Sequence, residues 1–161
     1  MTLLLLWTGL IVVVTALQAS MIPVVFLGVA KPDLPLILVV SCGLLTGKER
    51  AVGVAFFVGL LQDLTSGNIF GLNILAKMLT GYATGISERQ VFKENFLLPV
   101  LAVAVASLLN SAVMLALLFL FGYRMEWMEQ ITYQVLPSMG YNILLCIPLH
   151  KLVYWMEIRR K

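Results

Sequence analysis

The sequence contains few charged residues and very few of the side chains that metal sites and disulfide scaffolds use. Charged residues occupy 12% of its 161 positions, and it has one histidine and two cysteines. Cys42 and Cys146 both fall inside apolar segments, with no histidine or second cysteine at ligand spacing. His150 stands alone beside Lys151. We therefore predict neither a disulfide framework nor a metal centre.

The patterns that accompany common catalytic chemistries are also missing. The sequence has no G-x-S-x-G, H-E-x-x-H or P-loop motif, and no pair of carboxylates at a plausible catalytic separation. It has no basic stripe with interleaved aromatic residues of the kind that binds nucleic acid. We predict a protein that is not an enzyme, that has no catalytic residues and no cofactor, and that does not bind nucleic acid.

What the sequence has in abundance is apolar residues. Hydrophobic residues make up 61% of the chain, whereas about 45–50% is usual in soluble domains. The run from Leu3 to Ala30 carries no charge and has no lysine or arginine before it, so we interpret it as a retained helix and not as a cleaved signal peptide. The composition predicts an integral membrane protein with a single domain, residues 1–161.

Apolar runs long enough to cross a bilayer predict an all-α fold with six transmembrane helices, at about 3–25, 34–47, 50–65, 69–87, 96–122 and 132–156. The second and third runs are short enough to be re-entrant or buried segments instead. The distribution of lysine and arginine favours six crossings, because two cations then face the outside and eight face the side of the N-terminus. We therefore expect a protein of the bacterial inner membrane with both termini in the cytoplasm. The outer cations would be Lys31 and Arg124, and the inner ones Lys48, Arg50, Arg89, Lys93, Lys151, Arg159, Arg160 and Lys161.

Asp63 and Lys77 are the only charged residues between Arg50 and Glu88. In a hairpin of two membrane helices, Asp63 would lie near one interface and Lys77 within the hydrocarbon, where a lone ionised group costs roughly 2.5–3.5 kcal/mol. An ion pair between the two is feasible, but Lys77 could equally pair with a group on another helix. Lys77 then has a structural role, meets a partner's helix, or lines a solute or lipid cavity. Asp63 would be hydrated or would cap the turn at 66–68.

Polar residues form a stripe along the fourth predicted helix. Their spacing places them within one arc of the helix surface, and such a stripe must face protein or water because lipid cannot satisfy it. Gly81 and Gly85 lie at the edge of the arc and form a small-xxx-small pair, which would let a partner's membrane helix approach closely. The stripe consists of Asn73, Lys77, Thr80, Thr84 and Glu88.

The last two predicted helices carry a second group of uncharged polar residues. Buried amides and hydroxyls of this kind usually join membrane helices through hydrogen bonds, and the alternative is that they line a ligand cavity. The residues are Ser107, Asn110 and Ser111 on one helix and Ser138 and Asn142 on the other.

Several short motifs, taken in order, resemble the MreD family of bacterial rod shape-determining membrane proteins. Pro32-Asp33-Leu34 opens the second helix, and Gly59-Leu60-Leu61-Gln62-Asp63-Leu64 with Ser66-Gly67 closes the third. Gly71-Leu72-Asn73 and then Gly81-Tyr82 with Gly85 follow. The match is strongest from Pro32 to Glu88, while the last two helices agree in hydropathy and position. Lys77 is not part of the family pattern.

The resemblance implies a non-enzymatic scaffold subunit of the cell-elongation complex that makes peptidoglycan. It implies an MreC-like bitopic membrane protein as partner, together with MreB, the peptidoglycan polymerase and transpeptidase, and membrane lipids; a homodimer stays open. The family is similar in fold to the six-helix substrate-binding components of energy-coupling-factor transporters, so a small-molecule-binding subunit of a vitamin-type transporter is the alternative function. The candidate partner or cavity contacts are Asp63, Gly67, Gly71, Asn73, Lys77, Gly81 and Gly85.

Overall fold

The computed structural model of the chain describes residues 2–20, 30–67, 69–87, 97–123 and 126–158. This part of the chain is helical, with no strand, which confirms the all-α fold class. The helices are α1 (Thr2–Ser20), α3 (Leu34–Thr46), α4 (Lys48–Ser66), α5 (Leu72–Ile86), α6 (Leu97–Leu120), and α7 (Trp127–Gln130), η2 (Ile131–Val135) and α8 (Leu136–Ile158), the last three being continuous. Several predicted features lie outside the described residues: 21–25 of the first helix, Glu88, Arg89, Lys93, Arg124, Arg159, Arg160 and Lys161.

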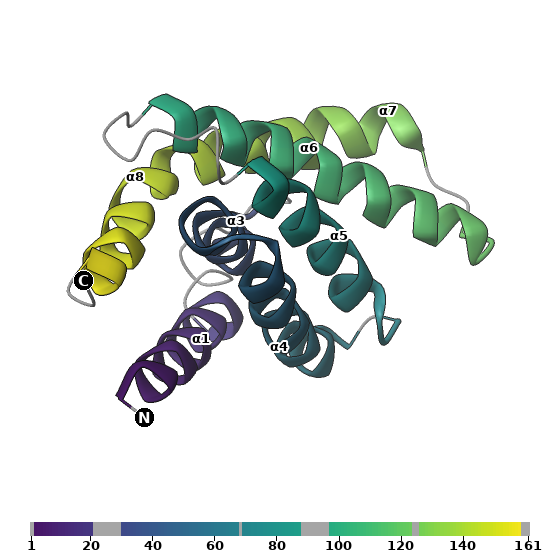
Figure 1. Cartoon of the computed structure of the whole chain (residues 1–161). Helices are drawn as coiled ribbons and strands as arrows, with labels where there is room; N and C mark the ends of the chain where they lie inside the picture. The colour runs from purple at the N-terminus through teal and green to yellow at the C-terminus, as the bar shows by residue number, and fades with distance from the viewer. Residues whose placement is uncertain (1, 21–29, 68, 88–96, 124–125, 159–161) are drawn as a thin grey trace.

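Helix α3 lies at the centre of the bundle (Figure 1). Its sequence, LPLILVVSCGLLT, is apolar on every face, and a helix of that kind is stable only where other helices cover it. Residues of α3 contribute to both hydrophobic clusters: Leu38 and Val39 pack with residues of α1, α4 and α8, and Leu36 and Ile37 with residues of α6 and α8. The short second run of the sequence is therefore the buried core helix.

Helices α4 and α5 form a closely packed hairpin in which glycines occupy the contact. A Cβ added to Gly59 would lie 2.6 Å from the Cα of Ile74, and one added to Gly81 would lie 3.1 Å from the carbonyl oxygen of Ala51. At Gly85 an added Cβ would overlap the backbone of Lys48. The prediction that Gly81 and Gly85 accept a partner's helix is therefore wrong, because α4 of the same chain already fills that face.

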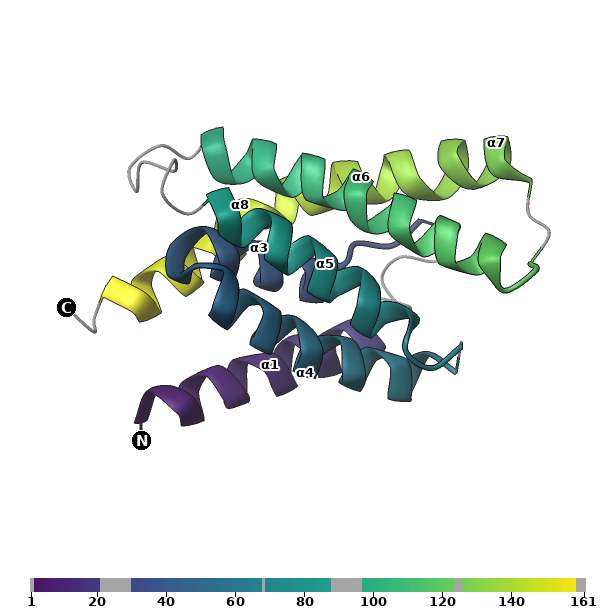
Figure 2. The same ribbon diagram turned by 45° about the vertical axis from the view of Figure 1, so that its right-hand side comes forward.

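The bundle has two distinct ends. Both chain termini lie at one end, which we call the terminus end, and the α4–α5 turn lies at the other, which we call the turn end (Figure 2). A single residue, Gly47, joins α3 to α4 at the terminus end. Helix α3 has 13 residues and α4 has 19, so at 1.5 Å per residue α3 is about 9 Å shorter. Because the two helices meet at the terminus end, the first residue of α3 lies about 9 Å short of the turn end, and we call this offset the recess of α3. The recess determines which side chains lie beside Asp33, because Asp33 is the N-cap residue of α3.

The outward faces of the helices are apolar. Helix α6 is long and apolar enough to cross a membrane, and it is the one helix of the described residues that meets both conditions; α3 and the described part of α1 are shorter apolar helices. Large exposed side chains along α6 include Leu101, Val105 and Phe119. Such a surface is unfavourable in water and suits contact with lipid.

The last helical rod is interrupted by a π-helical segment, η2. The N–H of Leu136 donates to the carbonyl of Ile131, five residues earlier, in place of the usual four. Pro137 follows at once, and a proline lacks the N–H that would bond four residues back and crowds the carbonyl there. The proline accounts for the widened turn, which ends at Val135.

Candidate functional site

Asp63 holds the start of α5. Its two carboxylate oxygens accept hydrogen bonds from the backbone N–H groups of Gly71 (2.9 Å), Asn73 (3.1 Å) and Ile74 (3.2 Å), and from the Asn73 side-chain amide (2.9 Å). Gly71, the N-cap residue, has no side chain to perform this task. Asp63 is only 4% exposed. The prediction that Asp63 is either hydrated or caps the turn at 66–68 is therefore wrong, because Asp63 is buried and caps the next helix.

Asp63 thereby ties the last turn of α4 to the start of α5. Gly67 and Gly71 have φ values of 65° and 98°, in the left-handed region that favours glycine. With Asp63 binding the backbone beyond the turn, the segment presents two large apolar side chains to its surroundings, Leu64 at 65% exposure and Phe70 at 61%. The turn end thus carries a braced apolar projection.

Lys77 is completely buried and pairs with Asp33. Its Nζ lies 2.9 Å from Oδ2 of Asp33, and the side chains are 0% and 22% exposed. Of the two pairings that the sequence left open, Lys77 therefore takes the one with a group outside its own hairpin, and the Asp63–Lys77 pair does not form. The positions of the residues along the bundle explain why Lys77 pairs with Asp33. Asp33 precedes the recessed start of α3 and therefore lies about as far from the turn end as Lys77, the sixth residue of α5.

Asp33 also joins other helices at the same level. Its Oδ1 accepts from the N–H of Leu36 and caps α3, while its own N–H donates to Oδ1 of Asn142 on α8 (2.7 Å). The Asn142 amide nitrogen donates to Oγ of Ser107 on α6 (3.0 Å). Gln18 of α1 bonds the neighbouring backbone, donating to Pro32 and accepting from Leu34. Side chains of α1, α5, α6 and α8 therefore converge, directly or through Asn142, on the residues that start α3.

The polar stripe on α5 faces the protein interior. Asn73, Lys77, Thr80 and Thr84 are each no more than 8% exposed. The hydroxyls of Thr80 and Thr84 donate to backbone carbonyls of their own helix, at Ala76 and Thr80. The prediction that this stripe avoids lipid is confirmed for these four residues, and it leaves little unused hydrogen-bonding capacity there.

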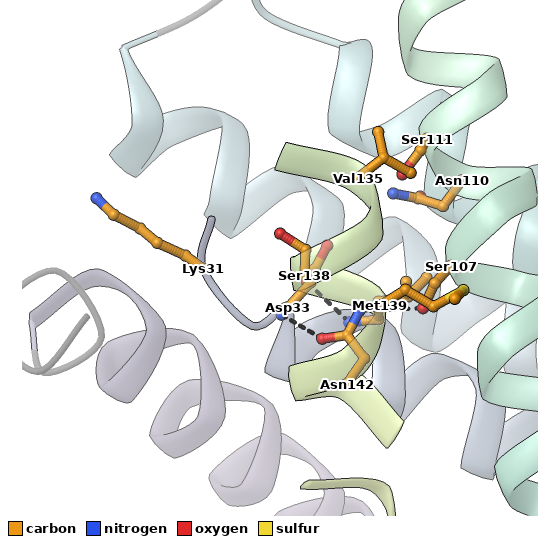
Figure 3. A pocket seen from close by; sticks show the side chains of 10 residues that line it. Lys31, Asp33, Ser107, Asn110, Ser111, Val135, Ser138, Met139 and Asn142 are labelled. Carbon is orange, nitrogen blue, oxygen red and sulfur yellow. Dashed lines mark hydrogen bonds between the residues drawn. The ribbon is translucent and has the colours of Figure 1, made fainter. Parts of the chain in front are cut away.

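A pocket lies on the other side of Asp33, between α6 and the η2–α8 segment (Figure 3). Its volume is about 120 Å³. Asn142 and Ser107, which bond one another, form part of its wall. The full lining consists of Lys31, Asp33, Leu36, Ser107, Asn110, Ser111, Val135, Ser138, Met139 and Asn142. The polar residues of the last two helices therefore serve both roles that the sequence left open, since some join helices and others line a pocket.

A comparison with known protein families identifies the family of this chain. The model of the family described as rod shape-determining protein MreD matches residues 1–158. The chain belongs to the MreD family. No curated protein and no solved structure gives a significant match. Membership in the MreD family establishes a membrane protein concerned with rod shape, and it agrees with the apolar outer surface of the bundle.

Sequence reasoning on this MreD family member missed Asp33 as the partner of Lys77, although Pro32-Asp33-Leu34 was recognised as the start of a helix. The available signal was the N-cap pattern of aspartate before an apolar run that begins Leu34-Pro35. It also missed Gln18, a lone amide in an apolar helix, which binds the residues on either side of Asp33.

Proposed function

We propose that the chain is a non-enzymatic scaffold subunit of the bacterial cell-elongation complex, and that it binds an MreC-like bitopic membrane protein. The family match over residues 1–158 is the observation that carries this proposal. The family is described by shape determination and not by a reaction.

The distribution of polar groups supports a scaffold. The charges within the bundle neutralise one another or bond to backbone: Lys77 with Asp33, and Asp63 with the first turn of α5. These contacts stabilise the bundle and leave its outer surface apolar. A partner's membrane helix would therefore meet the scaffold through shape and van der Waals contact, as is usual between helices in lipid.

The arrangement of the ends supports the proposed topology, a multi-pass protein of the inner membrane with six crossings and cytoplasmic termini. Both termini lie at the terminus end, as an even number of crossings requires (Figure 2). Exposed Lys48, Arg50 and Lys151 belong to elements that begin or end there, whereas exposed Lys31 precedes α3 on the opposite side. MreB would then meet the terminus end, and the polymerase and transpeptidase would meet the membrane-embedded surface.

The α4–α5 turn is the surface that we assign to the MreC-like partner. Gly67 and Gly71 shape it, Asp63 and Asn73 brace it from below, and Leu64 and Phe70 project from it. A braced apolar side chain loses little conformational entropy on binding, which is a property of interface residues that dominate affinity.

Copurification tests this assignment. A tagged chain purified from native membranes should bring down an MreC-like protein, identified by mass spectrometry. Replacing Phe70→Ala should weaken partner binding about thirtyfold and lower its recovery accordingly, because truncating a central apolar contact costs about 2 kcal/mol. Phe57→Ala is the matched control, since Phe57 is also exposed (57%) but lies within α4, away from the turn. Equal recovery with Phe70→Ala and wild type would remove the turn from the interface, and no MreC-like protein in the wild-type sample would overturn the proposal.

Nothing in the described residues supports the vitamin-transporter alternative. Its expected cavity along Asn73, Lys77 and Thr84 is filled, because all three side chains are buried in contacts within the chain. The pocket beside Asp33 has about 120 Å³, too little for a vitamin-sized ligand, since a cavity of about 150 Å³ is filled by benzene.

A further inference from the structure

The pocket between α6 and the η2–α8 segment contains polar side chains that the protein itself does not use. Asn110 is 8% exposed, and its amide oxygen is buried without a hydrogen-bond partner. Within the described residues, the side chains of Asn110, Ser111 and Ser138 form no hydrogen bond. An unsatisfied buried amide is costly, and such groups are uncommon in folded proteins.

These three side chains come from two elements and face one space. Figure 3 shows the Asn110 side chain extending from α6 toward Val135 and Ser138, with Ser111 beside it. Rotating the amide by a half-turn exchanges its donor and its acceptor, and each serine hydroxyl both donates and accepts. The pocket therefore offers several donors and acceptors to a single small molecule.

The charged groups at the pocket are already neutralised or directed elsewhere. One oxygen of Asp33 accepts from the ammonium of Lys77 and the other from the N–H of Leu36. Lys31 is exposed, and Figure 3 shows its ammonium directed away from the other lining residues. A charged ligand of either sign would lose its hydration without gaining a counter-ion, which strongly disfavours its burial. The unpaired groups thus select a neutral ligand.

The volume restricts the size of that ligand. About 120 Å³ is slightly less than the roughly 150 Å³ that accommodates benzene, so about six heavy atoms fit. The π-helical turn of η2 ends at Val135, on the pocket wall, and turns of this kind are frequent at functional sites.

We propose that this pocket binds a small neutral polyol, or the polyol end of a larger molecule, through Asn110, Ser111 and Ser138. The hydroxyl groups of such a ligand complement an amide and two hydroxyls, and its lack of charge suits a site without a free ion. This binding is separate from the scaffold role and does not depend on it. The polyol is either a free solute or the glycerol headgroup of a lipid.

Saturation-transfer NMR on the full chain in glycerol-free detergent tests the proposal with three probes of nearly equal size: glycerol, the anion glycerate and the cation serinol. We expect saturable glycerol binding with a Kd on the order of millimolar, as befits about six heavy atoms. Glycerate and serinol should bind at least tenfold more weakly. Non-saturable glycerol binding, or equal binding of the charged probes, would overturn the proposal.

Variants locate the binding. Asn110→Leu should weaken glycerol binding at least fivefold, and so should Ser138→Ala, which removes one oxygen and serves if the leucine variant does not fold. Gln134→Leu is the matched control, because Gln134 is an exposed amide on η2 outside the pocket. Unchanged affinity in both pocket variants would overturn the assignment.

Lipid composition distinguishes the two sources. In nanodiscs of phosphatidylethanolamine with added phosphatidylglycerol, competition that removes glycerol binding supports the site and identifies the lipid headgroup as its occupant. Undiminished glycerol binding in the same discs supports the site and identifies a free polyol. Failure of glycerol to bind in discs of phosphatidylethanolamine alone would contradict both.

Discussion

At the scale of single residues, Lys77 and Asp33 depend on one another unequally. Lys77 is fully buried, and its ammonium contacts the carboxylate 2.9 Å away. Asp33 is 22% exposed and keeps the N–H of Leu36 as a second partner. Because a buried ion that loses its partner keeps its desolvation cost, the more deeply buried member should suffer more from the loss of the other.

Unfolding measurements in detergent can test this asymmetry. Asp33→Asn should lower the free energy of unfolding by about 3–5 kcal/mol, since it leaves the Lys77 ammonium without its partner charge. Lys77→Met should cost about 1–3 kcal/mol, because Asp33 is partly hydrated and still caps α3. The double variant should be more stable than Asp33→Asn alone, and additive losses would show that the pair does not couple.

The sequence could show that Lys77 needs a partner but not which one. An isolated lysine in an apolar segment is visible in composition, and so is the aspartate at position 63. The decisive quantity was the depth of Asp33, which depends on α3 being shorter than α4 and on the tight link at Gly47. Asp63 is closer to Lys77 in the sequence, whereas the lengths of α3 and α4 bring Asp33 to the level of Lys77 in space.

At the scale of elements, the α4–α5 hairpin depends on glycines that differ in their surroundings. Gly59 lies against the backbone at Ile74, while a Cβ at Gly53 would have nothing within 4 Å. Both are inside α4, so their intrinsic helix preferences are the same.

Alanine at each position should therefore act in opposite directions. Gly59→Ala should destabilise by about 1–3 kcal/mol, because the added methyl group forces the helices apart. Gly53→Ala should stabilise by up to about 1 kcal/mol through helix preference alone. Thermal unfolding of the two variants beside wild type is the measurement, and equal effects would mean that α4 and α5 are not in close contact at Gly59.

The apolar runs of the sequence predict which helices form and in what order, but they do not predict what each helix face packs against. The predicted range 69–87 contains α5, and the buried face of its polar stripe was expected. The partner of Gly81 and Gly85 was not, because a small-residue pair permits close approach without specifying which helix approaches. The same limit applied to Asp63, whose hydrogen-bond donors are three backbone N–H groups and one side-chain amide, eight to eleven residues further along the chain.

At the scale of the whole molecule, the proposed topology places the two ends of the bundle on opposite sides of the membrane. Ser66 at the turn end and Glu49 near the terminus end are both exposed, while Cys42 and Cys146 are buried. In intact cells, Ser66→Cys should react with a membrane-impermeant maleimide and Glu49→Cys should react only after permeabilisation. The reverse pattern would invert the orientation, and labelling of both from outside would contradict the crossing of α4.

Composition alone could identify a membrane protein, because a chain that is 61% hydrophobic has too little polar surface to fold in water. The family could be recognised from short motifs around Asp63 and Gly71, and its model matches nearly the whole chain. A cavity beside the polar residues of the last two helices was one of two alternatives that the sequence left open. Its position next to Asp33 could not be foreseen, since it depends on the recessed start of α3 and on the π-helical turn before Pro137.

The central claim is that this membrane bundle maintains rod shape as part of the cell-elongation complex. Microscopy of rod-shaped cells during depletion of the protein measures this most directly. We predict that the cells widen and become round as the protein is lost, and that a supplied wild-type copy restores rods. Depleted cells that keep their width and rod shape over many divisions would contradict the claim.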